Sequence, residues 1–138
     1  MKAKIVRTVL PPIVGIVTVL VFLIAVNLIL YNGGGFSTSD NGFFTLFVPI
    51  TTIIAMAIQL TLTLNFWNRF KKDEKVWGMT LFQFTALLSI ISGMIFGLVF
   101  WETSLGINEF LLVTLVGIVA FALYWTANLF TMKQLDRL

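Results

Sequence analysis

Four long apolar runs, separated by short polar segments, dominate the pattern of hydrophobic and polar positions along the chain. Each run reaches the roughly 20 apolar residues that an α-helix needs to cross the hydrocarbon core of a bilayer. The pattern therefore predicts an all-α integral membrane protein, a four-transmembrane-helix bundle that forms a single domain over residues 1–138. The predicted spans are about 11–31, 43–67, 77–101 and 110–132, and the loops between them are 32–42, 68–76 and 102–109.

Residues at the ends of the runs favour the same boundaries. Pro11 and Pro12 are expected in the first turn of the first span, where a missing amide has no intrahelical partner to lose. Asn108 and Glu109 predict the start of the fourth span, because a capping side chain and an acidic first turn suit the helix dipole.

The basic residues predict the orientation of the bundle. If both chain ends and the 68–76 loop lie on one side of the membrane, that side receives all 9 Lys and Arg residues. Basic loops are typical of the cytoplasmic side, so both termini are predicted to be cytoplasmic, in a prokaryotic cytoplasmic (inner) membrane. The 32–42 and 102–109 loops are then external. The topology anchors of this prediction are Arg69, Lys71, Lys72 and Lys75.

Composition agrees with a membrane environment. Hydrophobic residues make up 59% of the chain and charged residues only 11%, whereas soluble domains carry roughly a quarter charged residues. The net charge of +3 does not indicate a nucleic-acid partner, because the basic residues lie at predicted membrane edges. The partners predicted from this surface are membrane lipids and other membrane subunits or further copies of the chain.

The chemistry available inside the spans is limited. The chain has no cysteine and no histidine, so the usual ligands of zinc, copper, haem and iron–sulfur clusters are missing and no cofactor is expected. No Asp, Glu, Lys or Arg lies in the interior of a predicted span. Since such residues mark most proton relays and ion paths, ion-coupled transport is disfavoured. An intramembrane enzyme is disfavoured as well.

Polar side chains at similar depths form a candidate polar layer. Counting helix rise from the predicted span ends places Gln59, Gln83 and Tyr124 at roughly 9 to 12 Å from the cytoplasmic edge. Two interpretations remain open: hydrogen bonds that hold the helices together, or a pocket for a lipid headgroup, a quinone-like molecule or a small solute. The residues of the layer are Gln59, Thr63, Gln83, Tyr124 and Asn128.

Small residues at helical spacing predict a close helix contact. Ser89, Gly93 and Gly97 recur every fourth residue, a pattern that lets a neighbouring backbone approach closely. Together with Gly117 they form a predicted helix-packing or partner face. The resulting functional hypothesis is a non-catalytic accessory or assembly subunit of a larger membrane complex. The alternative is a small oligomeric channel or transporter for a neutral or hydrophobic solute, which flux measurements in liposomes would test.

Overall fold

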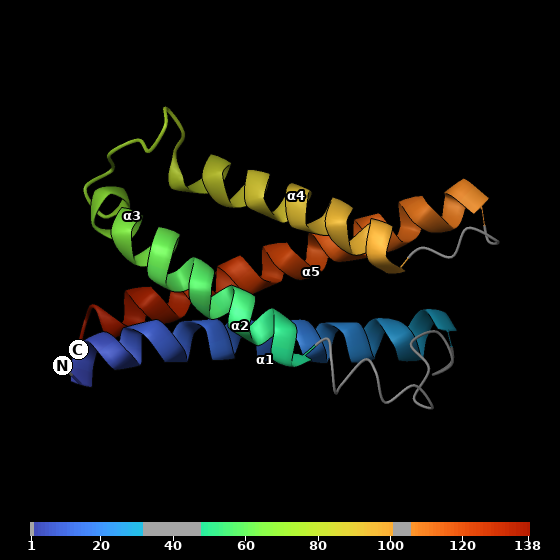
Figure 1. Ribbon diagram of the computed structural model, residues 1–138, viewed down its shortest axis with the longest axis horizontal. Coiled ribbons are helices and arrows are strands. Elements are labelled where there is room, and N and C mark those ends of the chain that lie inside the picture. Colours follow the sequence, from blue (N-terminus) through green and yellow to red (C-terminus); the bar gives the residue numbers. More distant parts are fainter. Residues whose placement is uncertain (1, 32–47, 101–105) are drawn as a thin grey trace.

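A computed structural model describes residues 2–31, 48–100 and 106–138. Almost all of these residues are helical, as the sequence predicts (Figure 1). The predicted 32–42 loop, the first five residues of the second predicted span and residues 101–105 lie outside the described ranges. The elements are α1 (Lys2–Tyr31), α2 (Val48–Ile58), the π-helix η2 (Gln59–Thr63), α3 (Leu64–Phe70), α4 (Leu81–Phe100) and α5 (Gly106–Leu135).

Helix α5 is the central element of the bundle. Both α1 and α4 pack along it, while α2 and η2 lie against α1 (Figure 1). Leu23 of α1, Phe96 of α4 and Ala120 of α5 meet in a small apolar core. Three of the described helices are long and apolar enough to cross a membrane, namely those covering Ala3–Leu30, Leu81–Phe100 and Gly106–Leu135.

Close contact between α4 and α5 depends on glycine. A Cβ atom added to Gly93 would lie 2.6 Å from the backbone nitrogen of Ile118 and 2.8 Å from its Cα atom. A Cβ atom added to Gly117 would lie 3.1 Å from the carbonyl oxygen of Gly93. The two helices therefore approach to a distance at which no side chain fits between them.

The first helix begins earlier than the sequence predicts. It starts at Lys2 instead of residue 11, so Pro11 and Pro12 lie in the helix interior and not in its first turn. An internal proline removes a backbone hydrogen bond and is tolerated in a membrane helix when another group replaces the missing donor. Helix α5 likewise begins at Gly106, ahead of the predicted Asn108 and Glu109.

The segment between α3 and α4 is a tight turn that delays the start of α4 to Leu81. Val76 and Met79 exchange backbone hydrogen bonds of 3.0 Å in each direction. Trp77 has a positive φ of 53° and Gly78 of 77°, backbone angles that cannot continue an α-helix. The predicted span start at residue 77 is therefore four residues early.

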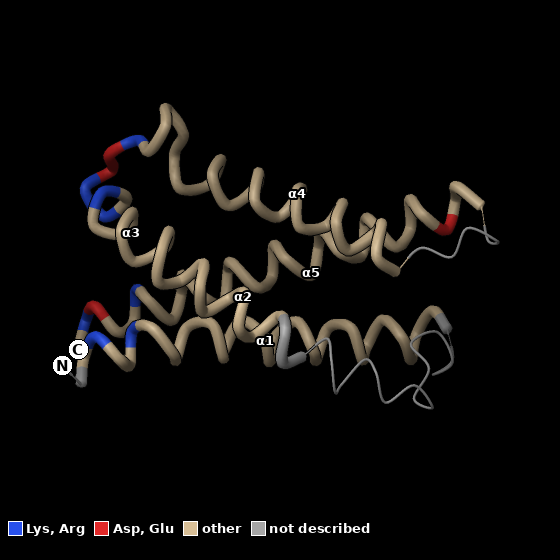
Figure 2. The backbone as a smooth tube through the Cα atoms, viewed as in Figure 1, with Lys and Arg blue, Asp and Glu red and all other residues tan. Residues whose placement is uncertain are grey.

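Charged residues gather at one end of the bundle. Figure 2 shows the basic residues of α1, of the end of α3 with the turn after it, and of the C-terminal part of the chain at the end where both termini lie. Glu109 lies in the first turn of α5, which begins at the opposite end of the bundle (Figure 1). The interior of the described helices between these ends carries no charge, which is the distribution expected for helices surrounded by lipid.

Candidate functional site

A buried hydrogen-bonded cluster joins α1, η2 and α5. The Gln59 side-chain amide donates to the carbonyl oxygen of Arg7 at 3.2 Å and lies 3.4 Å from the Met132 sulfur. Its oxygen accepts a 3.1 Å hydrogen bond from the Asn128 amide, which lies 3.2 Å from the Tyr124 hydroxyl. We call this cluster the Gln59 network. It comprises Gln59, Tyr124, Asn128, Met132 and the Arg7 carbonyl.

The Arg7 carbonyl explains how α1 tolerates Pro11. In an unbroken α-helix this carbonyl would accept the amide of residue 11, but Pro11 has no amide hydrogen. Gln59 supplies the missing donor from a different helix. Both Pro11 and Gln59 are almost completely buried, so water could not do so. The network therefore satisfies a backbone group that would otherwise be unpaired in an apolar interior.

A π turn begins at Gln59. The backbone amide of Leu64 donates to the Gln59 carbonyl, five residues back, which is the π pattern. One extra residue per turn shifts the side chains that follow around the helix axis. Gln59 and Thr63 both face the interior, where they are 1% and 8% exposed. Single π turns of this kind occur often at functional sites.

One acceptor of the Gln59 network has no donor. The Arg7 carbonyl can only accept, which fixes the orientation of the Gln59 amide, and the Gln59 oxygen in turn fixes that of Asn128. The remaining Asn128 oxygen is buried and has no hydrogen-bond partner among the described residues. Asn128 is 0% exposed, so this oxygen is an exception to the rule that buried polar groups are paired.

The structure brings together three residues of the predicted polar layer, Gln59, Tyr124 and Asn128. Gln83 does not belong with them, and its predicted place in the layer is wrong. Gln83 is exposed, and its side-chain oxygen accepts a hydrogen bond from the Thr80 backbone amide at 3.0 Å. The Gln83 backbone amide in turn donates to the Thr80 hydroxyl at 3.4 Å. This reciprocal pair is a capping box that starts α4. The turn at Trp77 moved the helix start towards Gln83, which depth counting did not anticipate.

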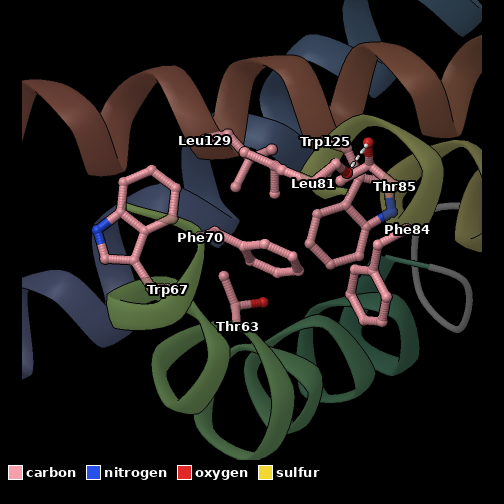
Figure 3. A pocket seen from close by; sticks show the side chains of 8 residues that line it. All are labelled: Thr63, Trp67, Phe70, Leu81, Phe84, Thr85, Trp125 and Leu129. Atoms are coloured by element: carbon pink, nitrogen blue, oxygen red, sulfur yellow. Dashed lines mark hydrogen bonds between the residues drawn. The ribbon is translucent and has the colours of Figure 1, made fainter. Parts of the chain in front are cut away.

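Thr63, the fifth member of the predicted layer, lines a separate cleft between α3, α4 and α5 (Figure 3). Four aromatic rings form most of its wall. The cleft is narrow, with free space for about one water molecule. We call it the aromatic cleft. Its lining residues are Thr63, Trp67, Phe70, Leu81, Phe84, Thr85, Trp125 and Leu129.

The predicted helix-packing face lies inside the bundle. Ser89, Gly93 and Gly97 of α4 and Gly117 of α5 are all buried. A Cβ atom on Gly97 would collide with the Thr114 side chain of α5, as one on Gly93 would with Ile118. These small residues therefore contact α5 or α4 within the same chain, and an external partner would meet other surfaces.

Sequence reasoning missed an ion-pair cluster at the charged end of the bundle. The Asp136 carboxylate lies 2.8 Å from the Arg7 guanidinium and 3.0 Å from the Lys71 ammonium. It also accepts a 2.6 Å hydrogen bond from the Trp67 indole. One acidic residue thus ties α1 and the end of α3 to the C-terminal residues. The tail carries one acidic residue among six, a weak signal in the sequence.

The same contacts set the protonation of Asp136. Burial raises the pKa of its carboxyl group, but hydrogen bonds from Trp67 and Lys71 and the charges of Lys71 and Arg7 outweigh burial. The pKa therefore lies below its ordinary value. A carboxyl group whose pKa is lower in the folded state stabilises that state above its unfolded pKa of about 3.9. This stabilisation is lost as the pH falls through the folded pKa.

We expect Asp136→Asn to lower the free energy of unfolding at pH 7 by about 1 kcal/mol, because it removes two ion pairs near the bundle end that solvent partly screens. In the unaltered protein the Asp136 contribution should hold from pH 7 to about pH 5 and decline below roughly pH 4. Denaturation in detergent across this pH range measures both effects. Asp73→Asn, an exposed carboxyl in the turn after α3, is the control. Equal behaviour of the two variants would contradict the assignment.

The predicted topology anchors occupy the same end of the molecule. Arg69, Lys71, Lys72 and Lys75 are exposed at the end of α3 and in the turn that follows. Lys71 alone among them is paired with Asp136. Within the described ranges no cluster of acidic side chains is arranged to hold a metal ion.

The fold places the chain in the class of all-helical proteins compatible with an integral membrane location, with three candidate membrane-spanning helices. No protein-family model, curated protein or solved structure matches the chain.

Proposed function

We propose that the chain is a four-span protein of a prokaryotic inner membrane, with cytoplasmic termini, and a non-catalytic accessory or assembly subunit of a larger membrane complex. In this proposal the second span, which is additional to the three long helices, is the helical run of α2, η2 and α3, which continues without a break from residue 48 to residue 70. At about 1.5 Å per residue it is long enough to cross the hydrocarbon core. The positive charge at the end that holds both termini supports their cytoplasmic assignment (Figure 2).

The observation that carries the proposal is the contrast between a closed polar interior and a broad apolar exterior. The Gln59 network bonds chiefly to itself and to one carbonyl, with no charged group among its members. Opposite its contact with α5, helix α4 presents a continuous apolar face. The residues of this face, which are 42% to 68% exposed, are Leu87, Ile90, Ile91, Met94, Ile95, Leu98 and Val99. Such a face suits either lipid or another transmembrane helix.

The proposal predicts that the protein migrates with a larger complex after mild detergent extraction from native membranes. Because the chain has no cysteine, single cysteines can probe its surfaces. Ile95→Cys on α4 and Val21→Cys on α1, which are 57% and 63% exposed, make a matched pair for crosslinking within membranes. We expect a reproducible crosslink to one partner from one of the two positions, and less of the assembled complex in cells that lack the protein.

A stable monomer that purifies without a partner and forms no crosslink from either position would overturn the proposal. Unchanged assembly of every associated complex in cells lacking the protein would overturn it as well. Crosslinks only between copies of this chain would instead favour the oligomeric channel, which flux in liposomes containing the protein alone would then test.

A further inference from the structure

We propose that a groove between α1 and η2 is a binding site for one anionic phospholipid, with the lipid phosphate at Lys4 and an acyl chain along the apolar walls. The groove has about 280 Å³ of free space, far more than a single water molecule needs, and it is open along one side. The proposal does not depend on the accessory role proposed above. The residues that line the groove are Lys4, Ile5, Thr8, Val9 and Leu60.

The free side-chain donor of the groove is the Lys4 ammonium. The Thr8 hydroxyl already donates its hydrogen to the Lys4 carbonyl at 2.9 Å. The Lys4 side chain is exposed and forms no ion pair with the residues that the structure describes. Arg7, one helical turn further along α1, shares the single Asp136 carboxylate with Lys71, so this end of the bundle keeps an excess of positive charge. The chemistry complementary to the groove is therefore that of an anionic headgroup.

The walls of the groove match the hydrocarbon part of a lipid. Ile5 of α1 and Leu60 of η2 line it from two different elements, and they are 57% and 50% exposed. Val9 continues the apolar wall one turn further along α1. Counting helix rise, Lys4 lies about 7.5 Å nearer the start of α1 than Val9 does. The groove therefore changes from a cation to apolar side chains in the direction in which a phospholipid changes from phosphate to acyl chain.

A hydrogen bond fixes the two walls of the groove relative to each other. The Gln59 side-chain amide donates to the Arg7 carbonyl at 3.2 Å, and these two residues directly precede Leu60 and Thr8 in the groove lining. The groove therefore exists before a lipid binds, and its open side admits a chain from the surrounding bilayer. The basic residues of α1 lie at the charged end of the bundle, the level at which phospholipid headgroups surround a membrane protein (Figure 2).

Native mass spectrometry of the full-length protein in detergent tests the proposal, because it separates the first bound lipid from later ones. The protein is titrated with anionic phosphatidylglycerol and with zwitterionic phosphatidylcholine of the same acyl chains. We expect the first phosphatidylglycerol to bind about fivefold more tightly, the effect of one basic residue near a lipid surface. Lys4→Gln should abolish this preference, and Lys4→Arg should keep it. Lys133→Gln, which removes an exposed lysine in the last turn of α5, is the control for net charge.

A second substitution tests the acyl part of the site. Leu60→Asn makes one apolar wall polar and should weaken the binding of both lipids severalfold. Ile53→Asn, at a position on α2 that is 69% exposed and lies outside the groove lining, is the control and should leave both affinities unchanged.

Four results would overturn the proposal. The first is equal affinity of the unaltered protein for the two lipids, and the second is the same lipid preference in Lys4→Gln and Lys133→Gln. The third is equal binding by Leu60→Asn and Ile53→Asn, which would mean that no acyl chain occupies the groove. The fourth is displacement of phosphatidylglycerol by an equal concentration of inorganic phosphate, which would assign the groove to a free anion instead of a lipid.

Discussion

Gly93→Ile is expected to lower the free energy of unfolding by about 3 kcal/mol, at the upper end of the usual cost of overpacking. The cause is the contact between α4 and α5, where even a Cβ atom would lie 2.6 Å from the backbone nitrogen of Ile118. A flexible side chain can turn away from an intruding atom, but a helix backbone cannot. The two helices would have to separate along the small-residue face of Ser89, Gly93, Gly97 and Gly117.

Denaturation in mixed detergent, followed by circular dichroism, measures this effect. Ala122→Ile is the matched control, because Ala122 is a small residue on α5 that is exposed at the surface of the bundle. It should change the unfolding free energy by less than about 0.5 kcal/mol, as most surface substitutions do. Equal stability of the two variants would contradict the close packing of α4 against α5.

Gln59→Leu is expected to destabilise the protein by about 1–3 kcal/mol, because it leaves the Arg7 carbonyl and the Asn128 amide without their Gln59 partner in a buried region. Hydrogen bonds between membrane helices contribute about 0.6 kcal/mol on average and up to about 1.7, which bounds the effect per bond. The same detergent denaturation applies. Gln134→Leu, at an exposed glutamine near the end of α5, is the control and should have little effect.

A double-mutant cycle with Pro11→Ala tests the reason for this effect. Alanine at position 11 restores an amide that can donate to the Arg7 carbonyl within α1. The Gln59→Leu substitution should therefore cost about 1 kcal/mol less in the Pro11→Ala background than in the native one. Additive effects would mean that Gln59 stabilises the bundle for some reason other than the unpaired carbonyl.

The Gln59 network shows which residue positions the local sequence pattern predicts and which it does not. Counting residues from the span ends placed Gln59, Gln83 and Tyr124 at a similar depth, and the structure joins Gln59 to Tyr124 through Asn128. The same counting failed for Gln83, since it assumed that α4 begins at residue 77. Trp77 and Gly78 instead form a turn with two positive φ angles, and Gln83 belongs to the cap at the start of α4.

The predicted start of the first helix at residue 11 was wrong for a different reason. Pro11 and Pro12 normally indicate a first turn, and locally that interpretation is the better one. The helix extends to Lys2 because groups distant in sequence support it: Gln59 pairs with the Arg7 carbonyl, and Asp136 pairs with the Arg7 side chain. Neither partner could be assigned without knowing which segments lie side by side.

Composition and periodicity alone determined that this protein is helical and that its long helices are apolar enough to cross a membrane. These are local properties, read from neighbouring residues. Only the tertiary structure decided that Asp136 ties three segments together, that Gln59 completes a hydrogen bond missing from α1 and that the Thr63 hydroxyl opens into an aromatic cleft. Each of these depends on contacts between residues far apart in the chain.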